Sequence, residues 1–276
     1  MSSLLHYLRV VREANTPIST ASTLSETGML TPEEWVAAGN GLVSRNPLFQ
    51  WKAAATSMSV AHLPPDKQYL VATKLPSYTR VADLQEVEQQ VHHVSLLSGL
   101  EGDDGYCLPL SGHKCKEDGN EEEEEDIVMV YGEDESDSKI GEKAAVTVTM
   151  RGQGHHDGTA GHERFYTLCI TYDKFYRTPR VFFYGHDRNG SSLSDEEIAA
   201  DVYYEYRRVV SMEPMPHSGS QMMRIHPCQH AKAMHNVIKT LVESDPDYEP
   251  KVEHYLLVFL KIISCVIPTI EYDYGG

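Results

Sequence analysis

The sequence predicts an α+β fold built on an antiparallel sheet with flanking helices. Residues 165–172 and 180–184 are rich in aromatic and β-branched side chains, which is the composition of strands. Helical patterns precede and follow these strands instead of alternating with them. Strands that are grouped in this way favour an antiparallel sheet with helices packed beside it.

The first helix is predicted from its start signal. Thr31 suits the N-cap position, Pro32 suits the first helical position, and Glu34 can reach back to the cap. Gly39 and Gly41 are expected to end this helix, because glycine is common just after a helical C-terminus.

Two further elements frame the central pair of strands. Residues 68–75 contain Tyr69, Leu70 and Val71 and are expected to form a strand. Ser194 and Glu197 form a second capping box, which predicts a helix that continues through Tyr206.

The charge of the chain excludes one class of partner. The 276 residues carry a formal net charge of −17. Binding to nucleic-acid phosphates requires Lys and Arg, so we expect no nucleic-acid partner.

Cysteine usage and hydrophobicity indicate a cytoplasmic protein. The five cysteines are scattered, which is typical of free thiols in a reducing compartment. Arg9 interrupts the first apolar run, which therefore lacks the layout of a signal peptide. Residues 255–270 are too short to span a bilayer comfortably and contain Lys261 and Pro268, so we expect a core helix there.

An acidic segment interrupts the folded pattern. Residues 117–142 contain thirteen acidic residues and one lysine, and such a run cannot fold alone. An apolar cluster lies within it, either as a chance feature of a solvated tether or as a docking segment that orders on a partner. The cluster consists of Ile127, Val128, Met129, Val130 and Tyr131.

Several Cys and His residues surround the acidic segment without the spacing of a metal site. They contain no Cys-x-x-Cys pair and fit no finger or ribbon pattern, so we expect no metal. These residues are Cys107, His113, Cys115, His155, His156 and His162.

The first fifteen residues form an amphipathic pattern. Leu4, Leu5, Leu8 and Val11 share one helical face, while the arginines lie elsewhere. Such a helix either docks on the domain core or lies in a membrane interface.

The segment His226-Pro227-Cys228-Gln229-His230 is the main candidate for chemistry. Proline suits the start of the helical run that follows, so Cys228 is expected at or near its first turn. Unpaired amides there favour a thiolate, which is the nucleophilic form of cysteine. The alternative is a buried, unreactive cysteine.

This segment resembles the active-site segment of the autophagy-related protein 3 family. The resemblance continues through residues 226–238 and 256–274, through the central strands at 170–180, and through 28–51 and 63–76. These blocks follow the family's order and cover somewhat more than half of the chain. The family consists of ubiquitin-conjugating-type enzymes that attach a ubiquitin-like modifier to phosphatidylethanolamine.

The resemblance implies a division of the chain into four parts. A ubiquitin-conjugating-enzyme-like core would comprise residues 16–82 and 164–276, with a membrane-sensing helix at 1–15. Residues 83–163 would form a flexible acidic insertion. Because the family's insertion binds the activating enzyme, the apolar cluster at 127–131 would be its anchor.

The resemblance also implies the reaction and its partners. The activating enzyme would transfer the modifier to Cys228 as a thioester, and the lipid amine would then attack it. No cofactor is implied. The expected partners are the modifier, its activating enzyme, the autophagy ligase conjugate and a membrane containing phosphatidylethanolamine. A cytoplasmic protein would therefore associate transiently with the periphery of autophagic membranes.

Three further residues are candidates at the site. Ubiquitin-conjugating enzymes have an Asn in a His-Pro-Asn segment, and Cys228 takes that third position here. His226 either holds the shape of the loop or transfers protons, and His230 is a second candidate. Ser211 replaces a family threonine, and it either orients Cys228 or is an ordinary strand residue.

Two other functions compete with lipid conjugation. A thiol hydrolase would use Cys228 with a histidine, although the papain-type signature is absent and the nearby histidines lie on the same segment. A non-catalytic adaptor would use the acidic insertion and the amphipathic end to join partners to a membrane.

Overall fold

The computed structural model describes most of the chain outside the acidic segment. The described residues are 11–12, 15–88, 163–245 and 248–271. The chain divides into two compact units, residues 1–91 with 158–276 and residues 92–157. The second unit lies outside the described residues, as does the apolar cluster within it.

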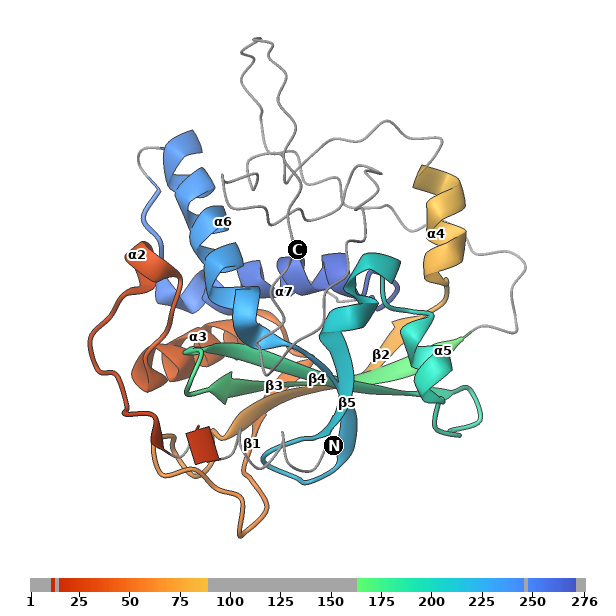
Figure 1. Ribbon diagram of the computed structural model, residues 1–276, viewed down its shortest axis with the longest axis horizontal. Coiled ribbons are helices and arrows are strands. Elements are labelled where there is room, and N and C mark those ends of the chain that lie inside the picture. The colour runs from red at the N-terminus through yellow and green to blue at the C-terminus, as the bar shows by residue number, and fades with distance from the viewer. Residues whose placement is uncertain (1–10, 13–14, 89–162, 246–247, 272–276) are drawn as a thin grey trace, which may run out of the picture. The chain divides into compact units, whose positions relative to one another are not determined.

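Six strands of the described residues form one antiparallel sheet (Figure 1). Across the sheet they are β1 (Phe49–Lys52), β2 (Tyr69–Ser77), β3 (Arg164–Asp173), β4 (Thr178–Asp187), β6 (Gln221–Ile225) and β5 (Val210–Pro214). The β3–β4 hairpin is paired along its whole length, from Arg164 with Asp187 to Asp173 with Thr178. The predicted α+β class with an antiparallel sheet is confirmed.

Helices flank this sheet, and α7 contacts both α3 and α6 (Figure 1). The α-helices are α2 (Leu24–Thr27), α3 (Pro32–Arg45), α4 (Val81–Glu88), α5 (Asp195–Ala199), α6 (His230–Ser244) and α7 (Tyr255–Val266). The 3-10 helices are η2 (Tyr204–Val209), η3 (Pro227–Gln229) and η4 (Val252–His254). Among the described residues, no helix has the length and hydrophobicity needed to cross a membrane.

The hydrophobic core includes residues from both the sheet and α7. Leu70, Ile170 and Val181 are register partners on three neighbouring strands, so their side chains share one face, and all three are fully buried. Phe259 and Leu260 of α7 are also fully buried. The predicted core helix is therefore confirmed.

The opposite face of the sheet is buried as well. Val71, Cys169 and Phe182 are register partners on that face, and they form a cluster with Met215 and Met222. Burial on both faces explains why β3 and β4 have continuous apolar runs instead of an alternating pattern.

Both predicted capping boxes are present. The Thr31 hydroxyl accepts the Glu34 amide at 3.1 Å, and the Glu34 carboxylate accepts the Thr31 amide at 2.7 Å. Ser194 and Glu197 make the same reciprocal pair at the start of α5.

Two predicted helix ends were wrong. Helix α3 continues past Gly39 and Gly41 to Arg45. A Cβ atom at Gly39 would lie 2.1 Å from the Trp51 ring, and one at Gly41 would lie 2.1 Å from the Glu253 carbonyl oxygen. These glycines permit close packing and do not end the helix.

The helix that was expected to continue through Tyr206 also ends earlier. Helix α5 ends at Ala199, and Tyr206 lies in the separate helix η2. Between them the Tyr203 amide donates to the Val266 carbonyl at the end of α7. Asp201 is fully buried in the same stretch. The chain therefore turns inward where the sequence pattern predicted a continuous helix.

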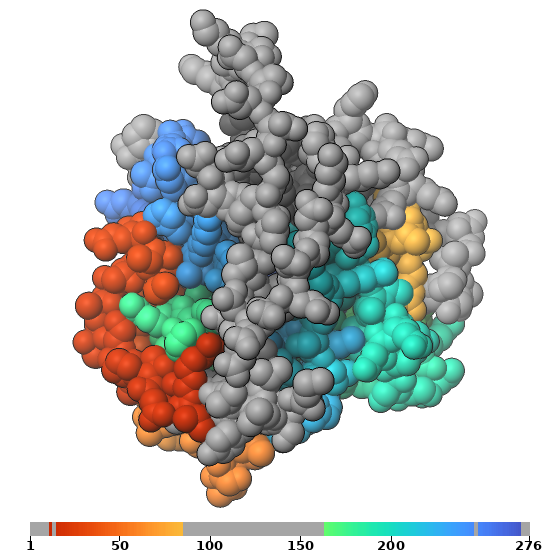
Figure 2. Space-filling view, in the orientation of Figure 1, coloured from red at the N-terminus to blue at the C-terminus, as the bar shows by residue number. Residues whose placement is uncertain are grey.

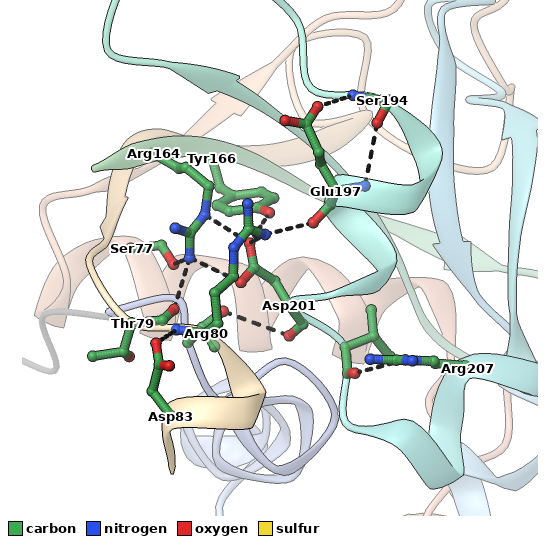
Figure 3. A network of polar contacts seen from close by, with 12 residues as sticks. Ser77, Thr79, Arg80, Asp83, Arg164, Tyr166, Ser194, Glu197, Asp201 and Arg207 are labelled. Atoms are coloured by element: carbon green, nitrogen blue, oxygen red, sulfur yellow. Dashed lines mark hydrogen bonds and ion pairs between the residues drawn. The ribbon is translucent and has the colours of Figure 1, made fainter. Parts of the chain in front are cut away.

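The Asp201 carboxylate joins three elements (Figure 3). The Arg164 guanidinium donates to both of its oxygens at 2.8 Å, and Arg80 donates to one at 2.9 Å. The Tyr166 hydroxyl donates to the same carboxylate at 2.5 Å. Arg80 lies just before α4 and Arg164 begins β3, so one carboxylate joins described parts of the core that precede and follow residues 89–162.

Replacing this carboxylate should destabilise the fold. Asp201→Asn removes the charge that compensates the buried Arg164, and we expect the free energy of unfolding to fall by about 3 kcal/mol. Urea denaturation measures the change. Glu243→Gln is the control, because Glu243 forms an exposed pair with Lys239 at 4.0 Å and should change stability by less than about 0.5 kcal/mol. Equal effects of the two substitutions would contradict the role given to Asp201.

Candidate functional site

Cys228 lies where the sheet passes into α6. Strand β6 ends at Ile225, His226 caps η3, and α6 begins at His230. Pro227 occupies the first position of η3, where a backbone N–H would have no partner within the helix, so the N–H that proline lacks is not needed. Cys228 is half-buried and stands in the first helical turn, as the sequence predicts.

His226 holds this turn through its ring and its backbone. Its Nδ1 atom accepts the Cys228 amide at 3.2 Å, and its own amide donates to the Val209 carbonyl at 2.9 Å. The ring packs edge-on against Tyr176, with centroids 5.7 Å apart. An Nδ1 atom that accepts a hydrogen bond carries no proton, so this arrangement corresponds to a neutral imidazole.

His230 has a structural environment. Its side chain is buried, its Nδ1–H donates to the Pro179 carbonyl of β4 at 2.8 Å, and its ring meets Phe259 edge-on. Burial lowers the pKa of His230 to about 4, so the ring is neutral near pH 7. These contacts join α6 to β4 and α7.

Ser211 lies on the exposed edge strand β5. It is the register partner of Arg224, and its hydroxyl donates to Glu213 at 3.1 Å. Glu213 in turn pairs with the buried Arg224 at 2.8 Å. The contacts of the Ser211 hydroxyl therefore favour a role in the strand-edge network.

A hollow beside the active-site segment contains residues that sequence reasoning missed. The β3–β4 turn, green in Figure 2, reaches the surface between the red amino-terminal residues and blue α6. We call the hollow at this turn the arginine hollow. It is lined by Arg12, Asp173, Phe175, Tyr176, Arg180, Arg224 and His226. They come from three separate stretches of the sequence, residue 12, residues 173–180 and residues 224–226, and no spacing rule predicts that these stretches meet.

The other described cysteines have environments that suppress thiolate formation. Cys169 is buried in the sheet, and burial raises its pKa to about 12. Cys265 is half-buried, its thiol donates to the Lys261 carbonyl, and its partial burial raises its pKa to about 11. Among the described cysteines, Cys228 alone lies in a helical first turn beside a histidine cap.

Several predicted site residues lie outside the described residues. For the membrane face only Val11 is described, and it is 36% exposed. Outside the described residues are Leu4, Leu5, Leu8, Ile127, Val128, Met129, Val130 and Tyr131. The same holds for Cys107, His113, Cys115, His155, His156 and His162.

The burial of His230 should make stability depend on pH. Below pH 6.5 the unfolded chain protonates this histidine, whereas the folded chain does not until about pH 4. The neutral His230 side chain therefore contributes fully to the free energy of unfolding above pH 6.5. This contribution, on the order of 3 kcal/mol, is lost as the pH falls towards 4. Urea denaturation between pH 7 and 4 measures the loss, which His230→Asn should reduce. Parallel profiles of the two proteins would contradict this account.

Comparison with known proteins finds a family match over most of the chain. The family profile described as "Autophagocytosis associated protein, active-site domain" matches residues 34–274. A curated "Autophagy-related protein 3" from Arabidopsis thaliana is 32% identical over 286 residues, covering 92% of this chain and 90% of the relative. Its counterpart from Schizosaccharomyces pombe is 32% identical over 288 residues, covering 95% and 94% respectively.

A third relative shows the same extent of similarity. "Autophagy-related protein 3" from Pichia angusta is 30% identical over 336 residues, which covers 96% of this chain and 95% of the relative. The match spans Cys228 and its flanking elements together with nearly all of the rest of the chain. The chain therefore belongs to the autophagy-related protein 3 family and is an autophagy-related enzyme of the ubiquitin-conjugating type.

Proposed function

We propose that the chain accepts an autophagy ubiquitin-like modifier as a thioester on Cys228 and transfers it to the amine of phosphatidylethanolamine. The observation that carries this proposal is the position of Cys228, a half-buried thiol in a helical first turn whose amide is held by His226. A thiol in this position is suited to nucleophilic catalysis, and it lies within the family's active-site domain.

Both steps are acyl transfers. In the first, the Cys228 sulfur attacks the thioester carbonyl on the activating enzyme, a new C–S bond forms, and the activating enzyme's thiol leaves. In the second, the lipid amine attacks the same carbonyl, a C–N bond forms, and the Cys228 thiolate leaves. The proton lost by the amine passes to solvent or to a nearby base. The product is an amide, and no redox change occurs.

His226 is a positioning residue in this proposal. Its Nδ1 atom accepts the Cys228 amide, so the ring fixes the backbone of the nucleophile. The edge-on contact of Tyr176 with the ring holds its orientation. We therefore favour the loop-holding role of His226 over direct proton transfer.

The proposal includes partners and a location. Membership of this family implies interaction with an autophagy modifier and with its activating enzyme. We further propose that residues 127–131 dock the activating enzyme, that the ligase conjugate assists transfer, and that Leu4, Leu5, Leu8 and Val11 contact the membrane. The protein would then be cytoplasmic, with transient peripheral association with autophagic membranes.

We expect transfer of the modifier to Cys228, which we call charging, to give a conjugate that a reducing thiol removes. The chain is incubated with the activating enzyme, the modifier and ATP and examined on a non-reducing gel. Wild type should give a band that thiol removes, Cys228→Ser a thiol-resistant ester, and Cys228→Ala no band. Cys265→Ala should charge like wild type. His226→Asn should also charge, because the Asn side-chain oxygen can accept the Cys228 amide in place of the imidazole.

Three results would overturn the proposal. A conjugate that persists in Cys228→Ala would place the thioester elsewhere. Hydrolysis of the modifier or of a peptide by the chain alone would instead indicate a thiol hydrolase. Wild-type autophagy in cells that carry only Cys228→Ala would indicate a non-catalytic adaptor.

A further inference from the structure

We propose that Asp173 is a positioning residue for Cys228. Its carboxylate folds the turn between β3 and β4, and this turn holds the active-site segment on both sides of the thiol. The inference rests on the proposed function, to which it adds a residue. Asp173 is the last residue of β3 and is 4% exposed, and the turn comprises residues 174–177.

The Asp173 carboxylate closes this turn. One of its oxygens accepts the amides of Phe175 and Tyr176, both at 3.0 Å. Its other oxygen pairs with Arg180 of β4 at 3.2 Å. An aspartate that accepts the amides of the residues two and three positions ahead stabilises a compact turn. The carboxylate therefore determines the shape of the turn and also joins the two strands beside it.

Arg177 shows that the turn is held in a conformation that a chain rarely adopts. Its φ angle is 54°, in the left-handed region that is unfavourable for residues other than glycine. Its carbonyl accepts the Leu30 amide at 2.8 Å, and its guanidinium donates to the Ala21 carbonyl at 3.2 Å. Such a conformation persists only where surrounding contacts impose it, and residues of this kind cluster at functional sites.

Strand register brings the turn to the active-site segment. Phe182 of β4 pairs with Arg224 of β6, and the two strands are antiparallel. The path from Phe182 back to the turn therefore runs beside the path from Arg224 forward to Cys228. A change in the shape of the turn is thus felt at the start of α6.

Contacts from the turn and the start of β4 lie on both sides of Cys228. On one side, Tyr176 packs edge-on against His226, whose Nδ1 atom accepts the Cys228 amide at 3.2 Å. On the other side, the His230 Nδ1–H donates to the Pro179 carbonyl at 2.8 Å. Because each histidine is two residues from the cysteine, displacement of the turn would displace the nucleophile.

The experiment measures the rate at which charged activating enzyme transfers the modifier to the full chain in a single turnover, over a range of chain concentrations. Asp173→Ala removes the oxygen that accepts the two amides. We expect its maximal rate to fall about ten-fold, because a misplaced nucleophile loses its alignment with the carbonyl. The chain concentration that gives half of the maximal rate should stay within about two-fold of wild type.

Asp173→Asn separates the shape of the turn from the ion pair. Its side-chain oxygen can still accept the two amides, so its maximal rate should return to within about two-fold of wild type. Both substitutions remove the charge that faces Arg180, and both should lower the thermal unfolding midpoint. The rates are therefore measured at a temperature where circular dichroism shows both variants to be folded. A purely structural role of the ion pair would make Asp173→Asn as slow as Asp173→Ala.

Tyr176→Leu tests the same route if Asp173→Ala does not fold. It leaves the carboxylate and its hydrogen bonds in place and removes the ring that contacts His226. Its maximal rate should also fall about ten-fold. A wild-type rate in a folded Tyr176→Leu chain would overturn the proposed route.

The matched control is Asp187→Ala at the other end of the same hairpin. Asp187 ends β4, and its carboxylate accepts the amides of Asn189 at 2.9 Å and Ser191 at 2.8 Å. The substitution therefore removes the same kind of carboxylate-to-amide turn, away from the active-site segment. Asp187→Ala should charge at the wild-type rate.

A double-mutant cycle tests whether Asp173 acts through His226. In a His226→Ala background, where the ring is already absent, Asp173→Ala should slow charging by no more than about three-fold. A further ten-fold loss in this background would show that the two residues act independently and would overturn the proposal.

The outcomes separate this inference from the function on which it rests. If wild type forms no thioester on Cys228, the proposed function fails. If wild type charges and a folded Asp173→Ala chain charges equally fast, the proposed function stands and the role of Asp173 fails. If Asp173→Ala raises only the half-saturating concentration, the turn is a docking surface, and the positioning role is likewise overturned.

Discussion

The buried Asp201 carboxylate is the interaction on which the arrangement of this fold depends. It receives hydrogen bonds from Arg80 and Arg164, so it joins the parts of the core at either end of the 86 residues (78–163) that separate the end of β2 from the start of β3. The chain then continues from Asp201 through η2 to Val209, whose carbonyl holds the His226 amide. The stretch from Asp201 to Val209 therefore connects the buried carboxylate to the base of the active-site segment.

Much of the fold follows from local sequence signals. The capping boxes at Thr31 and Ser194 and the aromatic strands β3 and β4 were predicted correctly, because each depends on neighbouring residues. The errors at Gly39 and Gly41 have a tertiary cause, namely close contact with Trp51 and with the backbone of Glu253. Local patterns do not contain such contacts, and neither do they contain the inward turn at Asp201.

The candidate site likewise has one part that local sequence predicts and one part that depends on tertiary contacts. Cys228 and its cap come from one short segment, so their proximity could be predicted. The arginine hollow collects Arg12, Arg180 and Arg224 from three segments. The β4–β6 pairing brings Arg180 and Arg224 onto neighbouring strands, and Arg12 lies over the Phe175 ring of the β3–β4 turn. His230 shows the reverse, since a histidine two residues from the thiol is directed into the core by the Pro179 carbonyl.

The central claim is that Cys228 is the reactive thiol of the described fold, and its alkylation rate tests this most directly. Iodoacetamide labelling of the folded chain near pH 7.5, resolved by peptide mass spectrometry, compares it with Cys169 and Cys265. The account predicts labelling of Cys228 at least about ten-fold faster than either of the other two, because burial raises their pKa values. Labelling of Cys228 no faster than that of Cys169 would show that the thiol is an inert structural residue and would contradict the account.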